Sequence, residues 1–232
     1  MMTIIVILIV SGALIIGAVW GIYGHMSDSL EGFLVALAGG ALLVSALLEL
    51  IHPALKEDSI AITLSMVFAG AVIFTILDYL VKEKWGSKSG GGLLAAITLD
   101  GIPENLALGV ALIGASPLSV AALSGSILLS NLPEAAGGSK EMTSNNISKK
   151  KVLLLWVGTA VILSISALLG HFLLADVPKE YLNYIKCFAG GAVAASLATE
   201  VFPKAFKKDK YWTGLATAIG LILALYLNTL GE

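Results

Sequence analysis

The chain has 232 residues, of which 57% are apolar and 13% charged, and its mean hydropathy is +0.93. Soluble domains carry about 25% charged and roughly 45–50% apolar residues, so this composition excludes a water-soluble monomer and favours an integral membrane protein. The formal net charge of −2 excludes the basic surface that binding to nucleic acid requires. One cysteine and three histidines exclude a disulfide framework and leave oxygen atoms as the main ligands for any metal.

Eight apolar segments are long enough to cross a bilayer as helices. A hydrocarbon core about 30 Å thick requires roughly 20 helical residues, and no segment alternates with the period of two that membrane strands show. No positively charged region precedes the first segment, so we expect a retained spanning helix and not a cleaved signal peptide. The predicted spans are 2–24, 31–55, 61–81, 92–113, 117–139, 151–174, 181–203 and 212–230.

The lysines predict how these spans are oriented. All fourteen cationic side chains are lysines; eleven follow the first, third, fifth or seventh span, and the other three are Lys56, Lys179 and Lys186. Because lysine-rich loops stay in the cytoplasm, we expect a plasma-membrane protein with both termini outside. The polar segment 140–150 is then a cytoplasmic loop between two halves of the chain.

An internal repeat indicates a transporter architecture. Residues 38–41 and 189–192 both read Ala-Gly-Gly-Ala, and the same shift of 151 positions superposes Glu49 on Glu200. The second and seventh spans run in opposite directions, so the repeat is predicted to be inverted; chance similarity of two helices rich in small residues is the alternative. The predicted parts are a first repeat, a central hairpin, a loop and a second repeat, at 1–82, 92–139, 140–150 and 151–232.

The central hairpin carries carboxylates inside apolar spans. Its fourth and fifth spans contain Asp-Gly-Ile-Pro-Glu-Asn at 100–105 and Ser-Asn-Leu-Pro-Glu-Ala at 130–135, joined by the turn 114–117. A buried carboxylate costs about 2.5–3.5 kcal/mol or more at membrane depth, so it needs a partner or a cation, and each proline frees a backbone carbonyl nearby. Helical spacing gathers these side chains into a predicted cation site, whose candidate ligands are Asp100, Glu104, Asn131 and Glu134, with Ser130 and Asn105 beside them.

Other polar residues of the spans have several interpretations. A satisfied polar core, in which the carboxylates are protonated or bond to Ser126, Ser130 and Asn105, is the alternative to a cation site. Glu49 and His52 at the outer side and Glu200 at the inner side are candidate ligands along the path of the ion, or charges that snorkel to the interface. Asp78 and Lys82, four residues apart, are interpreted as a solvated ion pair without a role.

At these residues the chain resembles the ZIP (Zrt/Irt-like protein) family of divalent-metal transporters. The family's helix-four motif, His-Asn-x-Pro-Glu-Gly, corresponds to 100–105, and its helix-five motif, His-x-x-Pro-Glu-Gly, corresponds to 130–135. The resemblance covers nearly the whole chain and implies eight spans, both termini outside, and a metal site bridged by Glu104 and Glu134.

The chain also departs from the family in its candidate ligands. Asp100 stands where the family has histidine, the span 151–174 contains no acidic residue, and no histidine-rich loop follows the third span. Oxygen ligands in place of imidazole favour harder cations than a typical member prefers. The missing acid predicts one principal metal position instead of two.

The sequence therefore predicts an all-α membrane protein that moves a divalent metal cation, zinc first and manganese, iron or cadmium next, towards the cytoplasm. The ion is the substrate, and no tightly bound cofactor or enzymatic activity is expected. The expected partners are metal ions and lipid, and nucleic acid is not expected. A homodimer is compatible with the sequence. A degenerate family member that binds or senses metal is the main alternative, and an intramembrane hydrolase using Ser124 or Ser126 with His171 is another.

Overall fold

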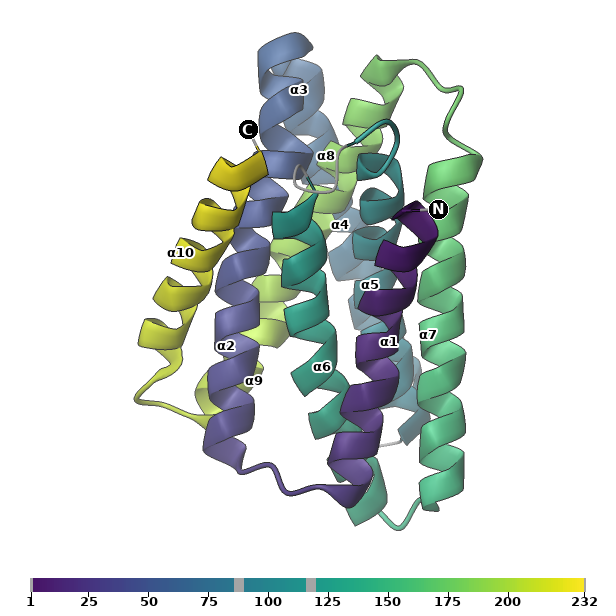
Figure 1. Ribbon diagram of the computed structural model, residues 1–232, viewed down its shortest axis with the longest axis vertical. Helices are drawn as coiled ribbons and strands as arrows, with labels where there is room; N and C mark the ends of the chain where they lie inside the picture. Colours follow the sequence, from purple (N-terminus) through teal and green to yellow (C-terminus); the bar gives the residue numbers. More distant parts are fainter. Residues whose placement is uncertain (1, 86–89, 116–119, 232) are drawn as a thin grey trace.

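The structure is a computed structural model that describes residues 2–85, 90–115 and 120–231, and within these ranges it is a helical bundle without strands (Figure 1). Long apolar runs form the helices, and turns rich in polar residues end them. The elements in chain order are α1 (Met2–Tyr23), α2 (Asp28–Ser45), η1 (Ala46–Ile51), α3 (His52–Glu57), α4 (Ile60–Trp85), α5 (Gly90–Ala111), α6 (Ala121–Ser144), α7 (Lys149–Phe172), α8 (Lys179–Ser196), η2 (Leu197–Val201), α9 (Phe202–Lys208) and α10 (Thr213–Gly231).

In the described part of the chain, six helical units are long and apolar enough to cross a membrane, and large apolar side chains cover their outer surface. Phe68 on α4, for example, is 71% exposed, as expected for a side chain that faces lipid. α5 and α6, which carry the predicted site, pack between α1, α2, α4, α7, α8 and α10. The six units are Met2–Tyr23, Asp28–Glu57, Ile60–Glu83, Lys149–Phe172, Lys179–Lys208 and Thr213–Leu230.

Two of these units contain a short π-helical turn at corresponding places. η1 lies between α2 and α3, and η2 lies between α8 and α9. Pro53 and Pro203 stand in the first turn of the α-helix that follows each π-helix. Because proline has no N–H to donate to the carbonyl one turn back, it disturbs the α-helical ladder and favours a wider turn. Each π-helix carries one predicted ligand, Glu49 or Glu200.

Close helix contacts occur in matched pairs. Gly40 of α2 packs against the backbone carbonyl of Thr217 on α10, and Gly191 of α8, 151 positions after Gly40, packs in the same way against the carbonyl of Val67 on α4. A Cβ at either glycine would collide with backbone, so only glycine allows these helices to approach so closely. The partner helices contribute glycines in the same way. Gly220 of α10 packs against the carbonyl of Leu37 on α2, and Gly70 of α4 packs against the carbonyl of Phe188 on α8.

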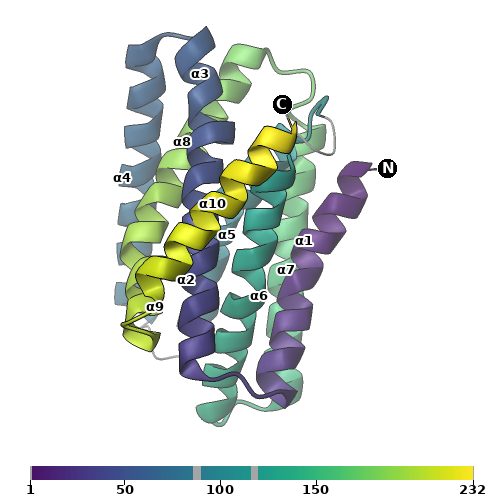
Figure 2. The same cartoon turned by 60° about the vertical axis from the view of Figure 1, so that its left-hand side comes forward.

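Ion pairs at the two ends of the bundle join corresponding positions of the sequence, but with the signs of the charges exchanged. Lys208 of α9 lies 3.2 Å from Asp28 of α2, and Glu57 of α3 lies 2.8 Å from Lys179 of α8. Glu57 and Lys208 are 151 positions apart in the sequence, and so are Asp28 and Lys179. α3 lies at the end of the bundle that holds both termini, whereas α9 lies at the other end (Figures 1 and 2). The α2 and α8 units therefore run in opposite directions.

One connection differs from the predicted boundaries, and a second lies partly outside the described residues. The segment 140–150 is mostly helical and not a loop, because α6 continues to Ser144 and α7 begins at Lys149. Lys140 holds this extension in place, since its Nζ donates to the carbonyl of Met26 at 3.0 Å and to Asp28 Oδ1 at 2.8 Å. In the hairpin, the turn predicted at 114–117 and the start of the span 117–139 lie partly outside the described residues.

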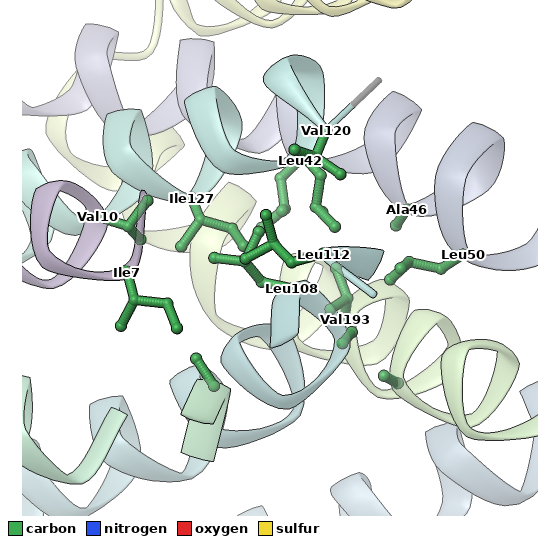
Figure 3. Packing of buried hydrophobic residues seen from close by; sticks show 14 of the residues in the cluster. Ile7, Val10, Leu42, Ala46, Leu50, Leu108, Leu112, Val120, Ile127 and Val193 are labelled. Atoms are coloured by element: carbon green, nitrogen blue, oxygen red, sulfur yellow. The ribbon is translucent and has the colours of Figure 1, made fainter. Parts of the chain in front are cut away.

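A large apolar cluster fills the half of the bundle nearest the termini (Figure 1), and Figure 3 shows how its side chains pack. Ile7 and Val10 come from the first turns of α1, whereas Leu112 and Val120 stand on either side of the α5–α6 turn. Leu42 and Leu50 approach from the α2 unit, and Val193 from α8. Close-packed apolar side chains exclude water and ions from the space that they fill, and this cluster is called the apolar seal below.

Candidate functional site

The half of the bundle away from the apolar seal contains a cavity of about 530 Å³. α5 and α6 form one side of it, and α2, η2 and α9 form the other. Its lining includes exposed residues such as Glu141 and Lys207, so the cavity reaches the surface at the α9 end. The lining residues are Val35, Ile97, Asp100, Ser130, Glu134, Glu141, Thr199, Glu200, Val201, Pro203, Lys204, Lys207 and Lys208.

Three of the predicted carboxylates line this cavity. Asp100 comes from α5, Glu134 from α6 and Glu200 from η2. Both Glu134 and Glu200 lie near enough to Asp100 for their charges to act on it. Oδ1 of Asp100 has no hydrogen-bond partner within the described part of the chain. An unpaired buried carboxylate is costly unless a proton or a cation compensates it, so these side chains stay candidates for a cation site.

The other candidate ligands of the hairpin have different surroundings. Glu104 is buried, with 7% of its surface exposed, and it lies within electrostatic reach of Glu134. The Nδ2 of Asn131 donates to the carbonyl of Val10 on α1 at 3.0 Å, and the Nδ2 of Asn105 donates to the carbonyl of Gly101 at 2.9 Å. Both amides thus cap backbone carbonyls, while Ser130 lines the cavity.

The two candidates at the sealed end lie in different surroundings. Glu49 lies on η1 near the charge of Lys186, and neither of its carboxylate oxygens has a hydrogen-bond partner among the residues described. His52 is exposed on the surface of the bundle. The structure therefore separates His52 from the carboxylates of the cavity, while Glu49 and Glu200 hold corresponding positions on η1 and η2.

Sequence reasoning missed the basic side of the cavity. Lys204, Lys207 and Lys208 line it together with Glu200. Their positions four, seven and eight residues after Glu200 are the spacing of one helical face, a signal visible in the sequence. Lys208 also pairs at 2.9 Å with Glu31, which is 1% exposed.

A second pairing links the cavity to α4. Lys82 Nζ lies 2.8 Å from Asp78 Oδ2, which confirms the contact predicted from their spacing. Asp78 is only 6% exposed, however, so the pair is not a fully solvated one. Lys82 also forms an ion pair with Glu200 on η2. The charge of a predicted ligand is thereby balanced by a lysine from a different helix.

The ligands do not converge as in a preformed metal centre. Within residues 2–85, 90–115 and 120–231, no three His, Cys, Asp or Glu side chains are close enough together to hold one metal ion. The donor set of the cavity is instead spread over three elements, α5, α6 and η2. A cation that uses all three carboxylates must draw these elements together.

No family model matches the chain, and no curated protein sequence is significantly similar to it.

Proposed function

We propose that this protein is a transporter that moves a divalent metal cation across a membrane towards the cytoplasm. The observation that carries the proposal is the meeting of Asp100, Glu134 and Glu200 in one cavity of a bundle whose surrounding helices are apolar. Intramembrane carboxylates are rare and costly, and they commonly mark the path of an ion. The residues 100–105 and 130–135, which resemble the paired Pro-Glu motifs of ZIP transporters, support the same assignment.

In this proposal α5 and α6 also span the membrane, which gives eight spans. Each has a polar face that would be unstable against lipid, and the flanking helices cover it. The lysines at the α9 end of the cavity support a cytoplasmic location for that end by the positive-inside rule. The cavity is then open to the cytoplasm, and the apolar seal around Leu112 and Val120 closes the outer side.

We further propose that the α1–α4 and α7–α10 parts form an inverted repeat. The matched glycine contacts, the two π-helices and the charge-reversed ion pairs support it. Transporters with inverted repeats expose a central site to alternate sides when the two halves exchange conformations. Glu49 would then face an outer cavity in the alternative state, as Glu200 faces the inner cavity here.

The chemistry of the site favours hard or borderline cations. Its donors are carboxylate and hydroxyl oxygens from Asp100, Ser130 and Glu134, with Glu200 on the cytoplasmic side. Such oxygens suit manganese, magnesium and iron(II), and zinc also accepts carboxylate ligands. The inside-negative membrane potential assists uptake, since about 2.3 kcal/mol is gained per charge for each 100 mV.

The experiment that tests the proposal is uptake into proteoliposomes that hold the native chain under an imposed negative potential. Separate assays would offer zinc, cadmium, manganese, iron(II) and magnesium, with protein-free liposomes as the control. We expect saturable, potential-dependent uptake of at least one of these ions. A folded native protein that moves none of them would contradict the proposal.

A second candidate function is metal binding or sensing without transport. The spread of the carboxylates over three elements favours it, because no three-ligand group is preformed in the described part of the chain. The same proteoliposomes distinguish the two functions. Saturable binding of an ion to the protein, without its accumulation inside the vesicles, is the result that a sensor predicts.

A further inference from the structure

Lys82 joins the cavity to the end of α4. Its ammonium group lies 2.8 Å from Asp78 Oδ2 and also pairs with Glu200. Asp78 lies one helical turn before Lys82 on α4, whereas Glu200 is on η2. The side chains of Lys82, Glu200 and Asp78 are 39%, 30% and 9% exposed, so this network is partly shielded from water.

The lysine ammonium and an incoming metal ion need the same carboxylate. Glu200 lines the cavity with Asp100 and Glu134, and its negative charge is one of those available to a cation there. In a partly shielded site the attraction between unlike charges at contact distance is stronger than in water. A metal ion that binds Glu200 must therefore compete with the Lys82 ammonium.

We propose that Lys82 is an internal competitor that promotes release of the metal ion to the cytoplasm. This inference rests on the proposed transport function. A metal ion that binds Glu200 displaces the lysine ammonium, which stays paired with Asp78. When the ion leaves, the ammonium returns to Glu200 and hinders rebinding from the cytoplasmic side. No covalent step is involved, and Lys82 acts through Glu200 as a positioning residue.

The two ends of the bundle differ in this respect. Glu49 occupies the position on η1 that corresponds to Glu200 on η2. Glu200 forms an ion pair with Lys82, whereas Glu49 is in none of the ion pairs of the described residues. Lys82 thus contacts the inner glutamate directly, whereas Lys186 lies near the outer glutamate without forming an ion pair with it, and this difference biases release towards the inner side.

Equilibrium binding tests the proposal. Purified native protein and variants in detergent would be titrated with Zn²⁺ and, separately, with Mn²⁺ by calorimetry. We expect Lys82→Met to tighten binding about five- to tenfold, in the range for loss of a partly shielded ion pair. Lys82→Arg keeps the charge and should bind like the native chain. Lys207→Met removes a charge that lines the same cavity and serves as the matched control, with a smaller effect.

A double-mutant cycle separates competition from a general effect of charge. In a Glu200→Gln background, Lys82→Met should no longer change the affinity for the metal ion, because Lys82 competes with the ion only for the carboxylate of Glu200. The small effect of Lys207→Met should persist in that background. Thermal unfolding of each variant identifies any that fails to fold. If Lys82→Met does not fold, Lys82→Arg tests the proposal, because this variant should bind metal like the native chain if only the positive charge is required.

The outcomes distinguish this inference from the proposed function. Unchanged or weaker binding in Lys82→Met, with native binding intact, would overturn the role of Lys82 and leave metal transport standing. Tighter binding that persists in the Glu200→Gln background would also overturn it. A native protein that neither binds nor transports any of the metal ions would overturn the transport function and this inference together.

Discussion

A buried charge distinguishes the two charge-reversed ion pairs at opposite ends of the bundle. Lys208 pairs both with Asp28, which is exposed, and with Glu31, which is 1% exposed. Lys179 pairs with Glu57, and the side chains of that pair are 74% and 45% exposed. Loss of one partner of a buried pair leaves an uncompensated charge, whereas an exposed pair contributes little.

We therefore expect unequal stability effects from the matched variants Lys208→Met and Lys179→Met. The first should lower the free energy of unfolding by about 2–3 kcal/mol, because Glu31 loses its partner. The second should lower it by less than about 1 kcal/mol. Thermal unfolding in detergent, followed by circular dichroism, measures both, and the double variant Glu31→Leu with Lys208→Met should recover most of the loss. Equal effects of the two single variants would contradict this account.

At the scale of helices, glycine positions determine which pairs of elements pack backbone to backbone. Gly191 of α8 lies against the carbonyl of Val67 on α4, whereas a Cβ at Gly158 on α7 would meet no atom within 4 Å. The first contact cannot accept a methyl group without moving backbone. The second position has space for it, and alanine is the better helix former.

Gly191→Ala and Gly158→Ala should thus change stability in opposite directions. We expect Gly191→Ala to destabilise the fold by about 1–3 kcal/mol, the usual cost of overpacking. Gly158→Ala should be neutral or stabilise it by up to about 1 kcal/mol. Denaturation of both variants in the same detergent gives the comparison, and a neutral result for Gly191→Ala would show that α4 and α8 separate readily.

Element boundaries show what the sequence could predict and what it could not. Apolar runs predicted the long helices because burial or lipid contact is their main source of stability. The continuation of α6 to Ser144 was not predicted, since it depends on Lys140 reaching Asp28 and the carbonyl of Met26, far away in the chain. The π-helices were also missed, although Pro53 and Pro203 mark both places.

The candidate site could likewise be predicted only in part, because some of its contacts join residues that become neighbours only in the folded chain. Carboxylates next to proline in an apolar span are visible in the sequence, and Asp100 and Glu134 do line the cavity. The direction of the Asn131 amide depends on a carbonyl of α1 that becomes its neighbour only in the folded chain. The pairing of Lys82 with Glu200 joins two helices and has no local signature either.

At the scale of the whole molecule, transport towards the cytoplasm through this cavity requires one orientation in the membrane. Lys207 lies at the mouth of the cavity, which we place in the cytoplasm, and Lys56 lies at the end that holds the termini. Both side chains are exposed, and the single native cysteine, Cys187, is buried. Cysteines placed at these two surfaces therefore report on opposite sides of the membrane.

We expect Lys56→Cys, and not Lys207→Cys, to react with a membrane-impermeant maleimide added to intact cells. Permeabilised cells should label both variants, and the native chain controls for the reactivity of Cys187. Labelling of Lys207→Cys alone in intact cells would reverse the orientation and with it the direction of transport.

The most direct test of the central claim is metal uptake by proteoliposomes with Glu134→Gln, compared with the native chain and Glu141→Gln. Both glutamates lie on α6 and line the cavity, but Glu141 is exposed at the mouth. We expect Glu134→Gln to lower saturable uptake at least about tenfold, the effect of losing about 1.4 kcal/mol of binding, and Glu141→Gln to retain most of the uptake. Native-like uptake by a folded Glu134→Gln protein would contradict the claim that this cavity carries the ion.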